Sequence, residues 1–216
     1  MLRVEFHCHT TYSKDSLTDP KELVLACQRK KIDRVIITDH NSIAGALLAQ
    51  KIDPQRVIVG EEIMTTQGEL LASFVNEEIP AGLPPLKAIE LLRAQEAFIS
   101  VSHPFDRWRD GHWKEADLLE IVPLVDAIET FNARCMLHRF NDQAHTFANL
   151  HNLPGTVGSD AHALYEVGKA VMLLPDFRDA LQLKKVIKEG LHETSLSSPL
   201  VHLSSRYASW SKKLKK

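Results

Sequence analysis

The sequence predicts an α/β protein of one domain, in which strands alternate with helices and the sheet closes into a barrel. Short apolar runs rich in β-branched residues, such as the VIIT of residues 35–38, alternate with stretches whose apolar residues recur at helical spacing. Strands that alternate with helices form βα units around a parallel sheet. Six or more such units within 216 residues favour a closed barrel over an open sheet.

The expected strands are short apolar runs at residues 4–6, 35–38, 57–59, 70–75, 98–101, 127–131, 156–157 and 171–174, and the pairing of 70–75 is left open. The expected helices cover residues 21–31, 43–50, 86–95, 133–150 and 178–189, of which 133–150 is the longest. Residues 118–125 are expected to be helical or irregular, because Pro123 interrupts a helix. The barrel domain is expected to span residues 1–195, and residues 196–216 to form a tail or a short helix packed on the barrel.

The composition is that of an ordinary globular protein, with 44% hydrophobic and 25% charged residues. The formal net charge is −2, so no overall field attracts nucleic acid or a membrane, although a local basic patch is compatible with it. The three cysteines have neither disulfide-framework nor zinc-knuckle spacing, which indicates a reducing compartment. We see no secretion signal and no apolar run of membrane-spanning length, and we therefore expect a cytoplasmic protein.

Histidine and carboxylate residues stand where the predicted strands end. His7 and His9 end the first strand, and because they are two residues apart they point to the same side of it. The groups that follow later strands are Asp39 with His40, Glu61 with Glu62, His103, and Asp160 with His162. The carboxyl ends of the strands in a βα barrel meet on one face, which is where barrel enzymes place their active sites. We therefore expect these side chains to converge.

Imidazole and carboxylate ligands suit zinc, manganese or iron(II). A structural zinc site holds four ligands, whereas at least eight candidates are present here, which predicts two or three divalent metal ions sharing carboxylates. Such a site activates a bound water to hydroxide and clamps the oxygens of a phosphoryl group. The remaining histidines end no predicted strand and are expected to be structural or exposed: His112, His138, His145, His151, His192 and His202.

Six motifs that run in order through most of the chain resemble those of the polymerase-and-histidinol-phosphatase (PHP) superfamily of metal-dependent phosphoesterases. They are HCHTTYSKD (7–15), TDHNS (38–42), GEE (60–62), SHP (102–104), IETFN (128–132) and GSDAH (158–162). Each motif is weak alone, whereas the ordered set is highly specific. The resemblance implies a distorted (β/α)7 barrel and, usually, a trinuclear centre of zinc, manganese or iron.

The resemblance also implies which residue holds which metal. His7, His9 and Asp160 would bind the first metal, which Glu62 would bridge to a second metal bound by His103; Asp15, His40 and His162 would hold a third. Of the adjacent glutamates, Glu62 fits the Gly-x-Glu spacing of the family, and Glu61 is expected to be a neighbouring solvated carboxylate.

Glu69 marks a departure from the family pattern. Many members carry a histidine before the strand that follows Gly-x-Glu, and this chain has Glu69 in that place. We expect Glu69 to bind the second metal as a carboxylate, which would favour manganese or iron(II). A loosely held second metal is the alternative.

Other polar residues are expected to contact substrate or to support the ligands. Arg134 and Arg107 are candidates for binding a phosphate through the guanidinium fork and stabilising charge, with Asp106 as a partner of Arg107. Surface ion pairs are the alternative for both arginines. Asn132 is a candidate for substrate contact, and both Glu129 and Asn132 are candidates for binding metal or orienting a ligand.

These features predict a phosphoesterase that hydrolyses a small phosphorylated substrate, such as a nucleotide or a sugar phosphate, with a metal-activated hydroxide. His103 or Asp39 is expected to move the proton of the leaving group. Nuclease action, or cleavage of an amide or ester, is the alternative with the same ligands, although near-neutral charge and few aromatics argue against an extended nucleic-acid groove. A non-catalytic accessory barrel is disfavoured because nearly all ligands are present.

Overall fold

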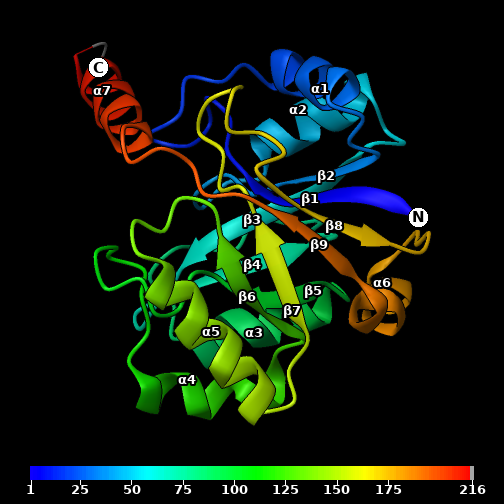
Figure 1. Ribbon diagram of the computed structural model, residues 1–216, viewed down its shortest axis with the longest axis vertical. Coiled ribbons are helices and arrows are strands. Elements are labelled where there is room, and N and C mark those ends of the chain that lie inside the picture. The colour runs from blue at the N-terminus through cyan, green and yellow to red at the C-terminus, as the bar shows by residue number, and fades with distance from the viewer. Residues whose placement is uncertain (215–216) are drawn as a thin grey trace.

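The computed structural model describes residues 1–214, and within them nine strands form one sheet that curls into a nearly closed, distorted barrel (Figure 1). The strands are β1 (Leu2–Cys8), β2 (Arg34–Ile37), β3 (Val57–Met64), β4 (Glu69–Ser73), β5 (Phe98–Val101), β6 (Ala127–Asn132), β7 (Gly155–Gly158), β8 (Ala170–Leu174) and β9 (Leu191–Thr194). Their order across the sheet is β7-β6-β5-β4-β3-β2-β1-β8-β9. The expected α/β barrel is confirmed.

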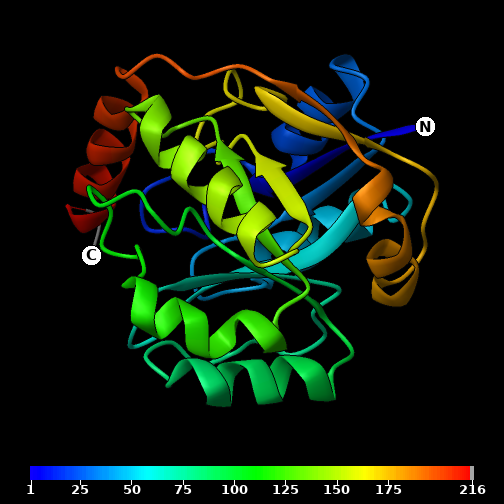
Figure 2. The same cartoon turned by 60° about the horizontal axis from the view of Figure 1, so that its bottom comes forward.

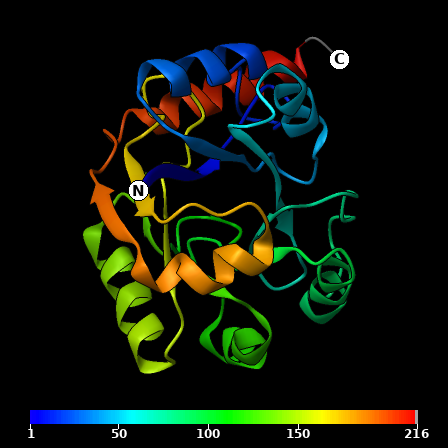
Figure 3. The same cartoon turned by 90° about the vertical axis from the view of Figure 1, so that its right-hand side faces the viewer.

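Helices surround the strands. They are α1 (Pro20–Arg29), α2 (Ala44–Ile52), α3 (Pro85–Ala94), α4 (Glu115–Ile121), α5 (His138–Leu150), α6 (Ala180–Val186) and α7 (Val201–Lys213), with short 3-10 turns at Val122–Leu124 and Ile187–Glu189. Figure 3 looks along the barrel, with α1 to α5 around the strands and α6 across the near end. Figure 2 shows α3 and α4 next to one another on the outside of the barrel, and α7 apart from them beside the C-terminus.

The barrel closes near the carboxyl ends of the parallel strands. Ala161, just beyond β7, forms a parallel bridge with Cys8 at the end of β1. The backbone N–H of His9 donates to the carbonyl of Ala161 at 2.8 Å. This contact brings the segment that carries Asp160 and His162 alongside the end of β1.

Two parts of the sheet are antiparallel, which corrects the expectation of a parallel sheet. Strand β4 runs against both β3 and β5, and β8 runs against both β1 and β9. For β4 the cause is its short connection to β3. The two strands are joined by a turn in which the N–H of Thr65 donates to the carbonyl of Gly68 at 3.0 Å. A parallel neighbour needs a longer crossover connection.

Local hydrogen bonds decide where two helices begin. Asp19 caps α1 by accepting from the N–H of Lys21 and of Glu22, ahead of a proline in the first turn. Helix α5 begins at His138, whereas the sequence predicted that it would begin at residue 133. The reason is that the Asn132 side chain accepts from the N–H of Arg134 at 2.9 Å and holds a turn there.

The chain beyond β8 adds a strand that the apolar pattern did not predict, and a helix that was one of the two forms expected for residues 196–216. Strand β9 pairs with β8. Residues 201–213 form α7, whose buried Val201 and Ala208 face the barrel, while residues 215–216 of the expected tail lie outside the described residues. Of the helices within residues 1–214, none combines the length and the apolar character that crossing a bilayer requires.

The hydrophobic core has two clusters. One joins the sheet to the helices around it and includes Leu23, Val35 and Ile89. The other joins strand residues such as Phe98 to Leu183 of α6. Burial of each such side chain contributes about 1.5–3 kcal/mol, so the strands form a rigid support for the residues at their carboxyl ends.

Candidate metal centre

His7 and His9 lie at the carboxyl end of β1 and are completely buried. Their Nε2 atoms are 3.1 Å apart, and each is 3.3 Å from Oε2 of Glu62. Gly158 of β7 permits this packing, because a Cβ there would collide with the Cβ of His7 and with the carboxylate of Glu129. The backbone thus passes close behind the first imidazole.

Glu62 is the centre of the cluster. Besides the two imidazoles of β1, its Oε2 lies 3.1 Å from His40 Nδ1, and its Oε1 lies 3.1 Å from His103 Nε2. Pairing between β2 and β3 continues past the end of β2, where the N–H of Glu62 donates to the carbonyl of Asp39 at 3.1 Å. This register places His40 beside Glu62.

Asp160, His162 and Asp15 complete the cluster on the side of β1 and β7. Asp160 Oδ1 is 3.2 Å from His9 Nε2, and Asp15 Oδ2 is 3.3 Å from His162 Nε2 and 3.6 Å from His40 Nε2. The backbone of Asp160 has a positive φ of 51°, a conformation unusual outside glycine that often marks a functional site.

Glu69, the first residue of β4, reaches the same cluster. Its carboxylate oxygens lie 3.4 Å from His103 Nε2 and 3.6 Å from His40 Nδ1. The backbone of Gly111 lies directly against this side chain and accepts a hydrogen bond from the N–H of Glu69 at 3.0 Å. Each of the nine expected ligands therefore lies within 3.4 Å of another member of the set.

Hydrogen bonds behind two of the imidazoles determine which ring nitrogen carries the proton. His162 Nδ1 lies 2.8 Å from the carbonyl of Asp160, which only accepts, so Nδ1 is protonated. His7 Nδ1 lies 2.9 Å from the carboxylate of Glu129 and donates to it. In both rings Nε2 is left as a bare lone pair that faces the cluster.

His9 is held in the same tautomer by a longer chain of hydrogen bonds. Its Nδ1 lies 3.0 Å from Ser13 Oγ, whose own proton goes to Asp39 Oδ1 at 2.6 Å. Asp39 also accepts from the N–H and the hydroxyl of Thr10. Ser13 Oγ therefore accepts from His9, and the Nε2 of His9 is bare.

The buried carboxylate oxygens of the cluster lack hydrogen-bond donors. Among the described residues, none donates to Glu62 Oε2, Asp160 Oδ1 or Asp15 Oδ1. A buried oxygen without a donor is costly unless a cation neutralises it. Three sets of ligand atoms, each set lying within 4.8 Å, are His9-His40-His162, His7-His9-Glu62 and His40-Glu62-Glu69. The donor set therefore fits divalent metal ions.

Both central carboxylates are ionised at neutral pH. Burial by itself raises the pKa of Glu62, but His7 and His40 outweigh it when they are protonated, and they then hold the pKa well below the ordinary value. A cation among the bare imidazole nitrogens would act in the same direction. Burial likewise raises the pKa of Asp160, and Arg109 brings it well below the ordinary value. Ionised carboxylates are the form that binds metal.

Comparison with known proteins agrees with this geometry. Residues 5–150 match the family model described as the PHP domain, and residues 138–191 match the one described as PHP-associated. The chain belongs to the PHP domain family. A relative from Methanocaldococcus jannaschii, the uncharacterized protein MJ0417, is 36% identical over 172 residues, which cover 78% of this chain and 69% of that protein.

Solved structures show the same fold. PsfC from Pseudomonas syringae superposes with a TM-score of 0.69 at 19% identity, covering 96% of this chain and 98% of that chain. A two-domain protein from Bacteroides vulgatus, described as containing a predicted PHP-like metal-dependent phosphoesterase, superposes with a TM-score of 0.72 at 17% identity. That match covers 90% of this chain and 65% of the Bacteroides chain.

In this PHP-family chain, Arg109 occupies the place that the sequence suggested for Arg107. Arg107 is exposed, and Asp106 lies 3.4 Å from Arg109 Nε instead of pairing with Arg107. Arg109 Nη2 lies 2.6 Å from Asp160 Oδ2. Both arginines belong to one irregular loop, so no periodicity in the sequence could tell which of them turns inward.

Asn132 and Arg134 support the PHP centre from behind. The amide of Asn132 donates to Glu129 and to Asp160, at 3.1 Å each. Arg134 is buried and lies 3.3 Å from Glu166, whose carboxylate accepts from the N–H of His162. Arg134 also lines the cavity beside the centre, so its expected role in binding substrate stays a prediction.

Asp39 and Glu61 lie off the centre. Both oxygens of Asp39 accept hydrogen bonds from Thr10 and Ser13. The expectation that Asp39 moves a proton to the leaving group stays a prediction. Glu61 faces the opposite side of β3 from Glu62, and it is buried there instead of solvated as expected. It accepts from the N–H of Ile79 at 3.0 Å. Burial raises the pKa of Glu61 to about 8.

A cavity of about 180 Å³ opens beside the centre. Two expected ligands, Asp15 and His162, line it together with Arg109 and with His202 and Ser205 of α7. His202 was expected to be structural or exposed, and its Nε2 donates to the carbonyl of Arg134 at 3.1 Å. The sequence placed His202 in a tail or a short helix packed on the barrel, and only the tertiary position of α7 brings it to the cavity.

Proposed function

We propose that this PHP-family chain is a metal-dependent phosphoesterase that hydrolyses a small phosphate ester, such as a nucleotide or a sugar phosphate. One observation carries the proposal: the buried imidazoles of His7 and His9 turn bare Nε2 atoms toward Glu62 Oε2 and Asp160 Oδ1, which are buried oxygens that lack donors. An arrangement of acceptors facing acceptors is stable when cations lie among them.

The ligands divide into three groups. His7, His9 and Asp160 would hold one ion, with Glu62 shared between it and its neighbour. His103 and Glu69 would hold the second ion. Asp15, His40 and His162 would hold the third. Two or three zinc, manganese or iron ions fit this count of nitrogen and oxygen donors.

Divalent ions bound there would supply an activated water nucleophile and positive charge for the phosphoryl oxygens. The protein adds Arg109, whose guanidinium lies at the edge of the cavity and 2.6 Å from Asp160 Oδ2. We propose that its guanidinium stabilises the negative charge that develops on the phosphoryl group during the reaction. His103 is assigned to a metal instead of proton transfer, because its Nε2 faces the carboxylates of Glu62 and Glu69.

The size of the cavity supports a small reacting group. A volume of about 180 Å³ lies below the range of about 300–1,000 Å³ that holds a whole drug-sized ligand. We propose that the phosphoryl group enters this cavity and that the rest of the substrate stays outside it.

The test is a screen of phosphate esters with manganese or zinc, in which released phosphate is measured. The panel contains nucleoside 5′-phosphates, nucleoside 3′,5′-bisphosphates and sugar phosphates, together with a short oligonucleotide, an amide and a lactone. We expect phosphate release from at least one monoester, and its loss in His9→Ala but not in the exposed control His145→Ala. Cleavage of the oligonucleotide, amide or lactone alone would replace the proposal. Fewer than one metal per chain, with no turnover, would overturn it.

A further inference from the structure

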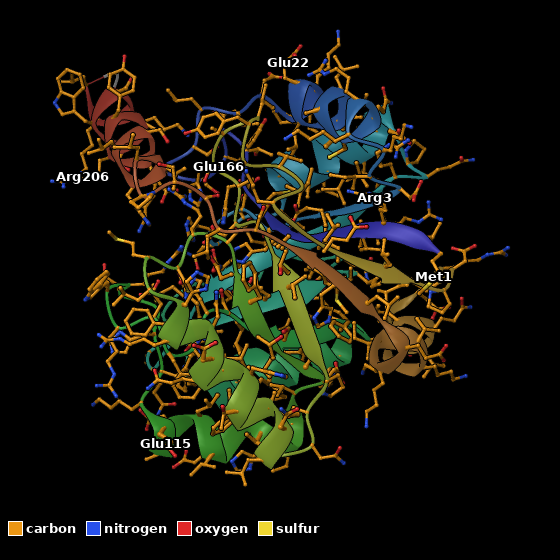
Figure 4. All side chains as sticks on the ribbon, viewed as in Figure 1. Met1, Arg3, Glu22, Glu115, Glu166 and Arg206 are labelled. Atoms are coloured by element: carbon orange, nitrogen blue, oxygen red, sulfur yellow. The ribbon has the colours of Figure 1, made fainter. Side chains whose placement is uncertain are left out.

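Helix α7 contacts two of the loops that supply ligands beyond the strands. One loop, residues 9–19, follows β1 and carries His9 and Asp15. The other, residues 159–169, follows β7 and carries Asp160 and His162. Figure 4 shows Glu166, of the second loop, between α7 and the barrel, and Arg206 on the outer side of α7.

The first contact is made by Lys212, near the end of α7. Its Nζ donates to the carbonyls of Thr11 and Ser13, at 2.5 Å each. Ser13 is the residue that holds the tautomer of His9, and Asp15 follows two residues later. One ammonium group therefore fixes the backbone between two ligands that lie on the same loop.

The second contact is made through Arg134. Its Nη2 donates to Ser205 Oγ at 2.7 Å and to the carbonyl of Val201 at 3.0 Å. Its Nε lies 3.3 Å from Glu166 Oε2, while Glu166 Oε1 accepts from the N–H of His162 at 3.2 Å. The first turn of α7 is thus joined to the His162 loop through one buried guanidinium.

The two loops meet at two pairs of ligands. His9 Nε2 and Asp160 Oδ1 are 3.2 Å apart beside the strand ends, and Asp15 Oδ2 and His162 Nε2 are 3.3 Å apart farther along the same loops. Ordering a loop residue costs about 1–2 kcal/mol in backbone entropy. If the loop is already ordered in the absence of metal, this entropic cost does not reduce the affinity for metal.

We propose that α7 is a clamp that sets metal occupancy at the Asp15-His40-His162 position by holding both loops. The inference rests on the metal centre proposed above. Lys212 and Arg134 act as positioning residues, since neither lies among the ligand atoms. His9 and Asp160 lie on the same loops, but the Cys8–Ala161 bridge and the hydrogen bond from the N–H of His9 to the carbonyl of Ala161 hold them at the strand ends. The ions at His7, His9 and Asp160 and at His103 and Glu69 are therefore less sensitive to α7.

The test compares Lys212→Met with the adjacent Lys213→Met, because Lys213 is exposed on the same helix. Manganese per chain is measured by mass spectrometry after dialysis at limiting free metal. We expect Lys212→Met to hold its last ion about tenfold more weakly, as loss of a charged hydrogen bond predicts, and Lys213→Met to match the unmodified chain. Ser205→Ala should weaken the same ion, because it removes one acceptor of Arg134.

A second readout does not depend on metal. Lys14 is exposed on the first loop, so trypsin reports on the order of that loop. In chelator, we expect release of the 1–14 fragment to be several-fold faster in Lys212→Met than in Lys213→Met. Equal metal content and equal cleavage in the two variants would overturn the clamp while leaving the phosphoesterase proposal standing. An unmodified chain that retains no metal would overturn both.

Discussion

Arg109 Nη2 lies 2.6 Å from Asp160 Oδ2, so a buried guanidinium contacts an expected metal ligand directly. The pair explains part of the low pKa of Asp160, since Arg109 is the largest influence that offsets burial. It also places a permanent positive charge beside the cavity that Asp15 and His162 line.

Arg109→Gln is expected to lower kcat by about 10²–10³-fold, the usual effect of losing one donor to developing charge. Metal content should stay the same, because the ligand atoms remain. Steady-state kinetics with manganese and metal analysis check this. The control is Arg107→Gln, two residues away and exposed, which should behave as the unmodified enzyme. Equal impairment of the two variants would contradict the assignment.

Glu62→Gln and Glu61→Gln are expected to differ sharply, although the residues are adjacent. Glu62 contacts four imidazoles, whereas Glu61 faces the N–H of Ile79 on the other side of β3. We expect Glu62→Gln to lose at least one metal ion per chain and nearly all activity, and Glu61→Gln to keep both. Metal analysis of the two folded variants decides the matter, and a metal-poor Glu61→Gln would count against the bridging role of Glu62.

Glu61 should make stability depend on pH. Its folded pKa is raised by burial from 4.5 to about 8, so the folded state keeps a proton that the unfolded chain releases above its ordinary pKa. The contribution of Glu61 to the free energy of unfolding is therefore fully present below about pH 4.5. It is lost as the pH rises toward 8, by at most about 1.4 kcal/mol per pH unit. The free energy of unfolding is measured by urea denaturation in the presence of chelator. Between pH 5.5 and 7.5, we expect it to fall in the unmodified chain and to fall less in Glu61→Gln. If the unfolding free energies of the two chains depend on pH in the same way, Glu61 is ionised in the folded state.

Removal of metal is expected to lower the melting temperature. Ions bind the folded centre, and free metal at 100 times its Kd adds about 2.7 kcal/mol. For a chain of this size each kcal/mol shifts Tm by about 2–4 °C, so a chelator should lower Tm by about 5–10 °C. Calorimetry with and without chelator measures the shift, and His9→Ala should show a much smaller one.

The cysteines are expected to be unreactive in the folded protein. All three are buried, and burial raises the pKa of Cys27 to about 12 and that of Cys8 well above its ordinary value. Labelling by Ellman's reagent at pH 8 should be slow until urea unfolds the chain, when three thiols react. Rapid labelling of the native protein would mean that the barrel opens locally.

The sequence could locate the candidate ligands that lie on strands or at strand ends, where the backbone is regular. His7 and His9 follow from the alternation of a strand, and Glu62 from its position at a strand end. Glu69 came from comparison with a family pattern and also lies in the cluster. Asp39 sits at a strand end too, yet its oxygens are filled by Thr10 and Ser13, contacts that its position in the sequence does not reveal.

The sequence by itself determined the barrel class and the nine candidate ligands, because strand periodicity and the ordered motifs are properties of short segments. Only the tertiary structure decided that Arg109 and not Arg107 faces Asp160, that β4 and β8 run antiparallel, and that α7 reaches across to two ligand loops. These outcomes depend on irregular loops and on contacts between residues up to 201 positions apart, as between Lys212 and Thr11. Such contacts are selected by the packing of the whole chain, and no local pattern encodes them.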